Sequence, residues 1–372
     1  MSHITYLEAS VVGLIQGVTE LFPVSRLGHN VLIPALIGGS WATDLNVAAS
    51  ESPYLAFIVG LHVATAIALL VYFWRDWVRI IGGFFSSIRD RRLETVDQKL
   101  AWMIILATIP VGLVGLRFEH EFRVLFGKPV RAAIFLVING LILFAGEKFR
   151  TRKSLEADAE LAAEAEVPEQ HAAPRSRTSG ATVPGATVPG ATVADAAVAG
   201  AAAGGGTVAG AAAPGATAHP VAMHASGQRA ARQMEAARAV QADTRLTKMG
   251  YVQALVIGSA QILALLAGIS RDGVVMVGGM FRGLSRQDAA RFSFLLSTPV
   301  ILAAGVLKIP DLTGHLGSGI RGQVIVGSIL SGVAAYLSVR FLMKYFQTRT
   351  LTPFAIYCVV AGLGSIIYLT LK

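Results

Sequence analysis

Two stretches decide the fold of this chain: Gly13-Leu-Ile-Gln16-Gly-Val-Thr-Glu20-Leu-Phe-Pro23-Val-Ser25-Arg26-Leu-Gly28-His29 and Gly258-Ser-Ala-Gln261-Ile-Leu-Ala-Leu-Leu-Ala-Gly268-Ile-Ser270-Arg271-Asp272-Gly273. Both read G-x2-Q-x8-S-R-x-G, and all the matching positions keep the same offset along the chain. Each stretch is otherwise apolar and is interrupted by polar residues, Gly or Pro. The sequence therefore contains an internal repeat whose two copies are broken apolar segments.

The composition of the whole chain indicates that lipid is its main solvent. Hydrophobic residues make up 53% and charged residues 15%, whereas soluble domains carry about 25% charge. A membrane-spanning helix needs about 17 to 25 residues. Six apolar runs are candidate spans: Pro53–Trp74, Leu100–Leu116, Ala132–Gly146, Phe292–Leu307, Gly322–Val339 and Thr350–Leu371. One cysteine excludes an internal disulfide framework and a multi-cysteine metal site.

The middle of the chain has a different character. It contains the tandem Gly180-Ala-Thr-Val-Pro and Gly185-Ala-Thr-Val-Pro, followed by Ala/Gly tracts, and it has no aromatic residue. Such a composition predicts a disordered linker, with surface helices over Leu155–Glu166 and Arg229–Ala242. We therefore predict three parts: a first membrane repeat (1–150), the linker (151–247) and a second membrane repeat (248–372).

The number of spans predicts how the repeats are oriented. Three candidate spans follow each broken segment, so if each segment enters and leaves on one side, the two copies insert with opposite orientation. Inverted repeats with broken helices at their interface are a recurring plan of membrane proteins. The predicted fold is an all-α polytopic membrane protein with two inverted repeats, each a re-entrant broken helix plus three transmembrane helices. In a rival topology, the uncharged run Gly250–Ser270 forms one simple span.

The distribution of charge argues against nucleic-acid binding. The net charge is +9, but basic and acidic residues balance within the linker, so the excess flanks the apolar runs. We find no RNP, zinc-finger or basic-helix pattern. Basic loops next to spans favour the cytoplasmic side. The loops Arg75–Lys99 and Arg340–Arg349 and the linker after Lys148 are therefore predicted to be cytoplasmic.

The first broken segment carries the richest chemistry. Glu20 and Arg26 would each cost about 2.5–3.5 kcal/mol at membrane depth, so they must face a cavity or each other. Gln16 shares a helical face with Glu20, and Pro23 is predicted to end that helix. The stretch from Ser25 then lies at the break, lining a polar cavity. The alternative is that Glu20 and Arg26 merely pair at the membrane surface.

The second broken segment predicts an anion site. A helix starting near Gly273 would point its free N–H groups at the cavity, where they attract phosphate. The guanidinium of Arg271 fits phosphoryl oxygens bidentately. The alternative is a loop arginine paired with Asp272. Brought together, the two breaks would surround a phosphorylated amphiphile with carboxylate, imidazole, hydroxyl and guanidinium groups.

The two stretches resemble the signatures of a known family. The stretch Gly13 to His29 is similar to the first signature of the undecaprenyl-diphosphate phosphatase (bacitracin-resistance) family, and Ala267 to Arg286 resembles the second. The resemblance covers nearly everything except the linker. It implies a bacterial plasma-membrane enzyme of interlocked inverted repeats, with its site facing outside. Such enzymes hydrolyse the C55 lipid diphosphate to the monophosphate and phosphate, which recycles the lipid carrier for peptidoglycan synthesis, and a divalent cation (Mg²⁺ or Ca²⁺) assists them.

The resemblance also implies roles for individual residues. It places catalysis on Glu20, Ser25 and His29, with Glu20 as a metal ligand beside Gln16 as a weakened neighbour. It assigns diphosphate binding to Arg271 and Ser270. The charge of Arg26 and the helix start near Gly273 add these two residues to the predicted diphosphate site. His62, inside an apolar span, is predicted to be structural.

The chain departs from the family pattern where chemistry is expected. In this chain Gln16 replaces a glutamate of the family pattern, Arg26 and Asp272 replace serines, Val275 replaces a threonine and Ala267 replaces a proline. Because arginine cannot attack phosphorus, His29 or Ser25 is predicted to be the nucleophile, with Glu20 as base or metal ligand. The alternative function is a non-hydrolytic paralogue that binds or translocates polyprenyl phosphate. The oligomeric state is open, and a homodimer is one state that the sequence allows.

Overall fold

The computed structural model describes residues 4–45, 53–126, 128–166, 237–307, 310 and 319–371, which contain helices and no strand. The first half contains α1 (Tyr6–Thr19), α2 (Arg26–Ile37), α3 (Gly39–Asp44), α4 (Pro53–Tyr72), α5 (Trp74–Asp90), α6 (Val96–Phe126), α7 (Pro129–Lys148) and α8 (Arg152–Glu166). The second contains a helix over Ala237–Thr247, α10 (Tyr251–Ser259), the 3-10 helix η1 (Ala260–Leu265), α11 (Arg271–Phe281), α12 (Arg286–Leu307), α14 (Arg321–Tyr345) and α15 (Thr352–Leu371).

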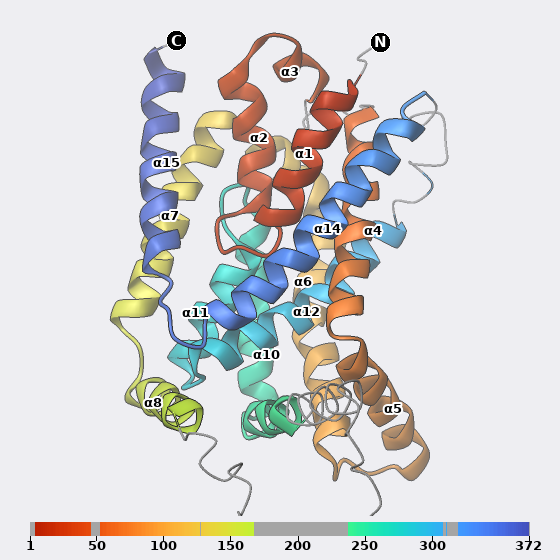
Figure 1. Cartoon of the computed structure of the whole chain (residues 1–372), viewed down its shortest axis with the longest axis vertical. Coiled ribbons are helices and arrows are strands. Elements are labelled where there is room, and N and C mark those ends of the chain that lie inside the picture. The colour runs from red at the N-terminus through yellow and green to blue at the C-terminus, as the bar shows by residue number, and fades with distance from the viewer. Residues whose placement is uncertain are drawn as a thin grey trace, which may run out of the picture. The chain divides into compact units, whose positions relative to one another are not determined.

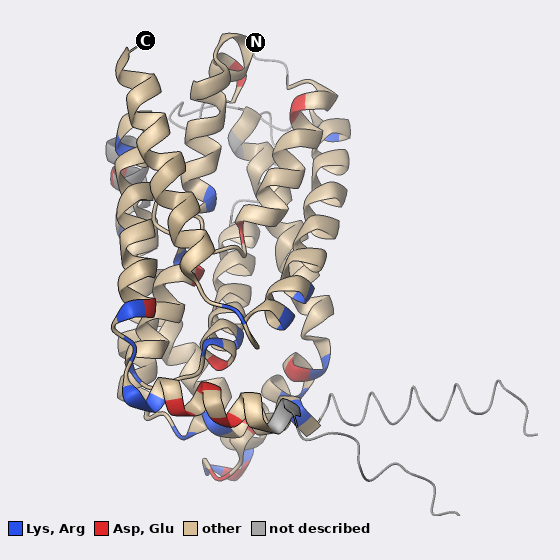
Figure 2. Cartoon of the chain, turned by 60° about the vertical axis from the view of Figure 1, so that its left-hand side comes forward, with Lys and Arg blue, Asp and Glu red and all other residues tan. Residues whose placement is uncertain are grey.

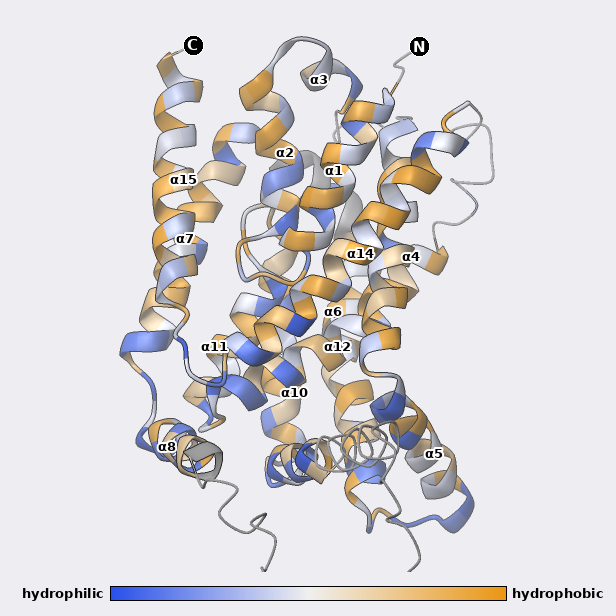
Figure 3. Cartoon of the chain, in the orientation of Figure 1, coloured by the Kyte–Doolittle hydropathy of each residue, from blue (hydrophilic) through white to orange (hydrophobic). Residues whose placement is uncertain are grey.

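All six predicted spans are helices, so the chain is an all-α multi-pass membrane protein. Five helices in the described part of the chain are long and apolar enough to cross a membrane: α6, α7, α12, α14 and α15. The sixth, α4, is bent by 86° against α5. Large apolar side chains of α14, such as Ile329 and Leu337, are exposed, as lipid contact requires, and Figure 3 colours much of α14 as hydrophobic.

The rival topology with one straight span over Gly250–Ser270 is wrong. The α-helix α10 ends at Ser259, a 3-10 turn continues to Leu265, and Leu266 is extended. The chain then turns through Gly268, whose φ of 118° suits glycine, before α11 leads it back. Both repeated stretches are thus helix–break–helix segments.

The first arm of each broken segment packs against a span from the other half. A Cβ on Gly13 of α1 would lie 2.5 Å from the carbonyl oxygen of Gly327 on α14, and one on Gly258 of α10 would lie 2.2 Å from that of Ala107 on α6. These crossings are so close that only glycine fits. The exchange of partners between the halves is consistent with interlocked inverted repeats, and Figure 1 shows α1 and α2 in the upper part of the view and α10 and α11 in the lower part.

The two ends of the predicted linker are folded. Leu155–Glu166 lies in α8 as predicted, and of the second predicted helix residues 237–242 are helical. Asp158 of α8 accepts the backbone N–H of Arg286 at 2.9 Å, and the buried Asp243 pairs with Arg79 at 2.6 Å and with Arg291 at 2.8 Å. Both ends of the predicted linker are therefore bonded to helices of the two membrane repeats, and the rest of the predicted linker lies outside the described residues.

The three loops predicted to share one side do so. α5, α8 and the turn from α14 to α15 lie at the lower end in Figure 1. Charged residues of both signs gather at that end (Figure 2), while the helices above it carry few.

Candidate active site

The first break lies between α1 and α2. α1 ends at Thr19 with Glu20 as its C-cap, so the helix ends before Pro23, which lies in the turn itself. The next helix begins at Arg26 after Ser25, whose φ of 67° is unusual for a residue other than glycine. The Ser25 hydroxyl oxygen accepts the N–H of Gly28 at 3.2 Å and that of Gly268, in the other break, at 3.1 Å.

The second break repeats this capping. Ser270 is the N-cap of α11, and its hydroxyl oxygen accepts the N–H of Gly273 at 3.2 Å. The helix thus begins at Arg271, two residues earlier than predicted, and the N–H of Gly273 is already bonded. The expectation of a free N–H group at Gly273 is wrong, because the serine of the S-R-x-G motif satisfies it.

Glu20 is the centre of the site and joins the two breaks. Its carboxylate pairs with Arg26 at 3.0 Å and with Arg271 at 2.9 Å. The amide of Gln16 donates to the same carboxylate at 2.8 Å, and Asn30 in turn donates to Gln16 at 3.0 Å. The Glu20 side chain is 2% exposed, so this is a buried cluster and not a pair at the membrane surface.

The two guanidinium groups have the charge and the geometry to bind an anion. The side chains of Arg26 and Arg271 are 18% and 15% exposed, which leaves each an edge outside the cluster. One carboxylate between two guanidinium groups has a net charge of +1. Planar N–H forks of this kind bind carboxylate and phosphate alike, so the oxygens of Glu20 occupy positions that phosphoryl oxygens can take.

His29 is not part of that cluster. Its Nδ1 donates to the Ser25 carbonyl at 2.7 Å, so Nε2 of the neutral ring accepts the hydroxyl of Tyr357 on α15, also at 2.7 Å. The two rings stack with centroids 5.8 Å apart. The structure thus brings together Glu20, Arg26 and Arg271 as predicted, whereas the imidazole expected beside them bonds to α15.

A second imidazole, on α4, lies near enough to the charged cluster to interact with it electrostatically. His62 on α4 donates from Nδ1 to the Ile58 carbonyl at 2.6 Å, which leaves Nε2 as the lone-pair nitrogen of the neutral ring. Electrostatic interactions link His62 to Glu20, Arg26 and Arg271. The sequence predicts a structural histidine here, and only the folded arrangement of α4 against the breaks shows its neighbours.

Asp272 does not pair with Arg271. Its Oδ1 accepts the hydroxyl groups of Ser293 and Ser297 on α12, both at 2.6 Å, while Arg271 bonds to Glu20. The alternative of a local arginine–aspartate pair is therefore wrong. The aspartate ties α11 to α12 and leaves the guanidinium to the first break.

Asn139 on α7 is the main residue that the sequence reasoning missed. Its amide donates to the carbonyl of Pro23 at 2.9 Å and accepts the N–H of Ser270 at 2.9 Å. One signal was present in the sequence: Asn139 is the single polar side chain in the predicted span Ala132–Gly146. Polar groups inside spans bond to protein partners.

The protein groups do not fit a tightly held divalent cation. Within the described ranges, no three His, Cys, Asp or Glu side chains lie close enough to share a metal ion. Both oxygens of Glu20 are already bonded to arginines, and Gln16 donates its amide to Glu20. A cation would have to compete with two guanidinium groups for one carboxylate.

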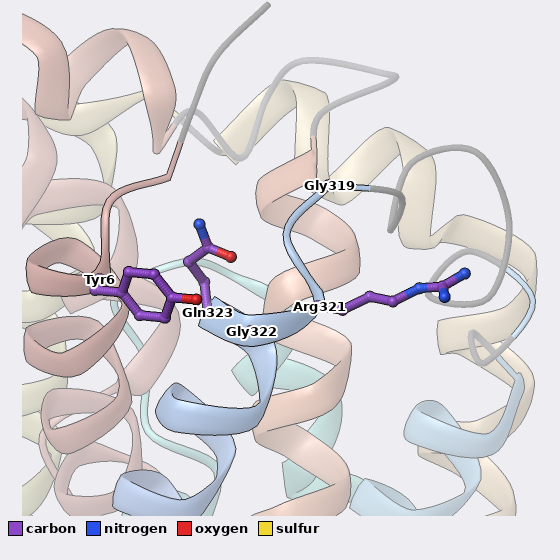
Figure 4. Close-up of a pocket in the computed structure, with 5 residues that line it drawn as sticks. All are labelled: Tyr6, Gly319, Arg321, Gly322 and Gln323. Atoms are coloured by element: carbon purple, nitrogen blue, oxygen red, sulfur yellow. The ribbon is translucent and has the colours of Figure 1, made fainter.

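An open pocket at the start of α14 is separate from this cluster. It is lined by Tyr6, Gly319, Arg321, Gly322 and Gln323, and Figure 4 shows the Arg321 side chain directed away from Tyr6. None of the predicted site residues lines it. This pocket is therefore not the candidate active site.

Comparison with known proteins agrees with the two signatures. The family model described as bacitracin resistance protein BacA matches residues 9–228 and 221–364. The chain is 52% identical to the undecaprenyl-diphosphatase of Mycolicibacterium paratuberculosis over 371 residues, covering 100% of this chain and 99% of that protein. It is 51% identical to undecaprenyl-diphosphatase 2 of Frankia alni, covering 97% of each, and 33% identical to undecaprenyl-diphosphatase 2 of Burkholderia ambifaria, covering 94% and 92%.

Proposed function

The chain belongs to the bacitracin resistance protein BacA family, and we propose that it is an undecaprenyl-diphosphatase. It hydrolyses undecaprenyl diphosphate to undecaprenyl phosphate and phosphate, which returns the lipid carrier to cell-wall synthesis and confers bacitracin resistance. The observation that carries this proposal is the Glu20 carboxylate held between Arg26 and Arg271, because it places two phosphate-binding groups from two distant segments at one point.

Substrate binding is an exchange of anions. The diphosphate head group takes the guanidinium edges of Arg26 and Arg271 and displaces the Glu20 carboxylate from them. Guanidinium groups bind phosphoryl oxygens bidentately, and they stabilise the charge that builds up on those oxygens during transfer. The polyprenyl chain extends into lipid, since large apolar side chains of the nearby helices, such as Ile329 on α14 and Leu363 on α15, are exposed.

Of the two predicted nucleophiles, the geometry favours Ser25. Its oxygen accepts two backbone N–H groups, which stabilise an alkoxide, whereas Nε2 of His29 is occupied by Tyr357. Glu20, released from the arginines, takes the hydroxyl proton as Ser25 attacks the terminal phosphorus. The bond to the bridging oxygen breaks, undecaprenyl phosphate leaves as an anion, and water then hydrolyses the phosphoserine.

His29 is assigned a positioning role in this scheme. Its Nδ1 holds the carbonyl of Ser25, and its Nε2 is bonded to α15. Together these bonds support the positive φ of Ser25. No step is routed through a divalent cation, because within the described residues Glu20 belongs to no group of three His, Cys, Asp or Glu side chains that could hold one.

The orientation in the bacterial plasma membrane follows from charge. The charged end that holds α5 and α8 is assigned to the cytoplasm, and with it the ends of the linker. α1 and α2 run to the first break from the opposite end (Figure 1), and on this ground we place the active site on the outside. The homodimer stays a prediction.

The experiment is a phosphate-release assay on protein purified in detergent with undecaprenyl diphosphate. Wild-type protein should release phosphate, and Arg271→Ala should lower the rate by about 10²–10³-fold, as expected for removal of a transition-state donor. Arg321→Ala, which removes an exposed arginine at the Figure 4 pocket, is the matched control and should keep the rate. Saturable binding of the lipid without phosphate release would instead support the non-hydrolytic paralogue. If Arg26→Ser then gained turnover, the arginine at the position of the family's serine would be the reason that hydrolysis was lost.

A further inference from the structure

The side-chain amide of Asn139 is a bridge between the two breaks. Nδ2 donates to the Pro23 carbonyl and Oδ1 accepts the Ser270 N–H, each at 2.9 Å, and Nδ2 also lies 3.3 Å from the sulfur of Cys358. The side chain is fully buried. In an apolar medium a broken helix must find partners for its exposed main chain within the protein, and this one amide serves both segments.

The two bonded groups stand next to the reacting residues. Pro23 lies three residues after Glu20, and Ser270 immediately precedes Arg271. An amide bonded to both therefore fixes the separation of the two segments that supply the carboxylate and the guanidinium. A side-chain amide is suited to this task, because it carries a hydrogen-bond donor and an acceptor side by side on one group.

We propose that Asn139 is a positioning residue that keeps the two breaks in register while the substrate is bound. The proposal rests on the proposed function. Besides the close packing of Gly28 on Gly268, two other polar contacts cross between the breaks within the described residues: the Glu20–Arg271 ion pair and the bond from Gly268 to Ser25. The diphosphate displaces the first, and the second ends on the nucleophilic oxygen. Asn139 is the bridge that no step of the reaction opens.

The surroundings of Asn139 suit a fixed support. A Cβ on Gly268 would lie 2.4 Å from the carbonyl oxygen of Ala132, so the second break lies directly against α7. A Cβ on Gly140, next to Asn139, would lie 2.7 Å from that of Ala355, so α7 also packs closely on α15. The helix that carries the amide is therefore held from two sides.

The first test is steady-state kinetics on Asn139→Leu, which removes the donor and the acceptor at similar volume. We expect kcat to fall about 100-fold, since a misplacement of about 1 Å can cost that much, while KM stays within about threefold. Asn139→Asp keeps the acceptor for the Ser270 N–H, and its kcat should lie between those of wild type and Asn139→Leu. Leu342→Ala, a buried core change on α14, is the control: it should lower Tm and keep kcat. A wild-type kcat for Asn139→Leu, or the same kcat loss in Leu342→Ala, would overturn the proposal.

The second test does not depend on turnover. Cys358 is buried and is left in place, and spin labels are attached to cysteines at Val18 and Leu263, exposed residues close to the two breaks. With undecaprenyl diphosphate added, we expect one narrow distance distribution, which Asn139→Leu broadens. An unchanged distribution would contradict the positioning role. If the wild-type protein released no phosphate, the proposed function would fail, yet the spin labels would still decide whether Asn139 holds the breaks together.

Discussion

The two breaks share a scaffold and differ in their chemistry. In each, serine caps the second helix, arginine is its first residue and the glycine N–H three residues after the serine bonds to the serine oxygen. The first break adds a network of polar groups around Glu20. In the second, the matching Gln261 bonds to its own backbone at Gly258, and its buried Oε1 has no hydrogen-bond partner.

This difference shows that the repeat conserves geometry and not function. The S-R-x-G motif builds a helix start inside the membrane in both copies, and this start sets where an arginine points. The carboxylate, the strained serine and the surrounding amides belong to the first copy alone. The second copy contributes one guanidinium, so the active site is asymmetric although its frame is repeated.

The largest expected effect is at the centre of the first break. Glu20→Gln keeps the size of the side chain and removes its charge and its basicity. We expect kcat for phosphate release to fall about 10²–10⁴-fold, the usual contribution of a general base. Initial rates at saturating lipid measure it. A rate within tenfold of wild type would show that Glu20 is not the general base, and that the difference between the two breaks does not serve proton transfer.

The two serines offer a matched comparison, because both cap a helix. Ser25→Ala and Ser270→Ala should each lose about 0.5–2 kcal/mol of stability, as N-cap removal does. Only Ser25→Ala should also lose activity, by at least about 100-fold, since it removes the nucleophile. Thermal unfolding and phosphate release are measured on the same samples. Equal activity losses would contradict the assignment of the nucleophile to the first break.

Removal of divalent cations with EDTA tests whether Arg26 and Arg271 bind the diphosphate without the help of a metal ion. Because Arg26 and Arg271 already hold the anion site, we expect EDTA to change the wild-type rate by less than about threefold, below a free-energy change of about 1 kcal/mol. Arg26→Ser removes one guanidinium and should make the remaining activity respond to added Mg²⁺. A wild-type rate that collapses in EDTA and returns with Mg²⁺ would refute this expectation.

The smallest expected effects separate the two glutamines of the repeat. Gln261→Leu removes one bond, from Nε2 to the Gly258 carbonyl, and an oxygen that has no hydrogen-bond partner, so it should cost at most about 0.5–1.5 kcal/mol. Gln16→Leu breaks the bonds to Glu20 and Asn30 and should cost about 1–3 kcal/mol. Denaturation midpoints of the two variants measure this. Similar losses in both would mean that the second break hides polar contacts like those of the first.

The fold could be predicted because its causes are local. Apolar runs located all six spans, and the repeat located both breaks, since an interrupted apolar stretch with Gly or Pro cannot form one straight span. The start of α11 was placed two residues late because a serine cap was not recognised in Ser270. The contacts of the linker ends could not be predicted, because the partners of Asp158 and Asp243 lie far from them in the sequence.

The site was predictable only where charges were forced together. Glu20, Arg26 and Arg271 must share a cavity because each is costly in lipid, and the structure joins them. The partner of His29 lies on the last helix, and no local pattern points to Tyr357. Asn139 is one polar residue in an apolar span, and its meaning depends on both breaks being packed against α7.

The most direct test of the central claim is the affinity of Glu20→Gln for undecaprenyl diphosphate. If the carboxylate occupies the place of the phosphate between Arg26 and Arg271, its removal should tighten binding about tenfold or more, because each charged hydrogen bond that the lipid need not displace is worth about 1.5–3 kcal/mol. Equal or weaker binding would mean that Glu20 does not compete with the head group, and the two arginines would then not be its binding site.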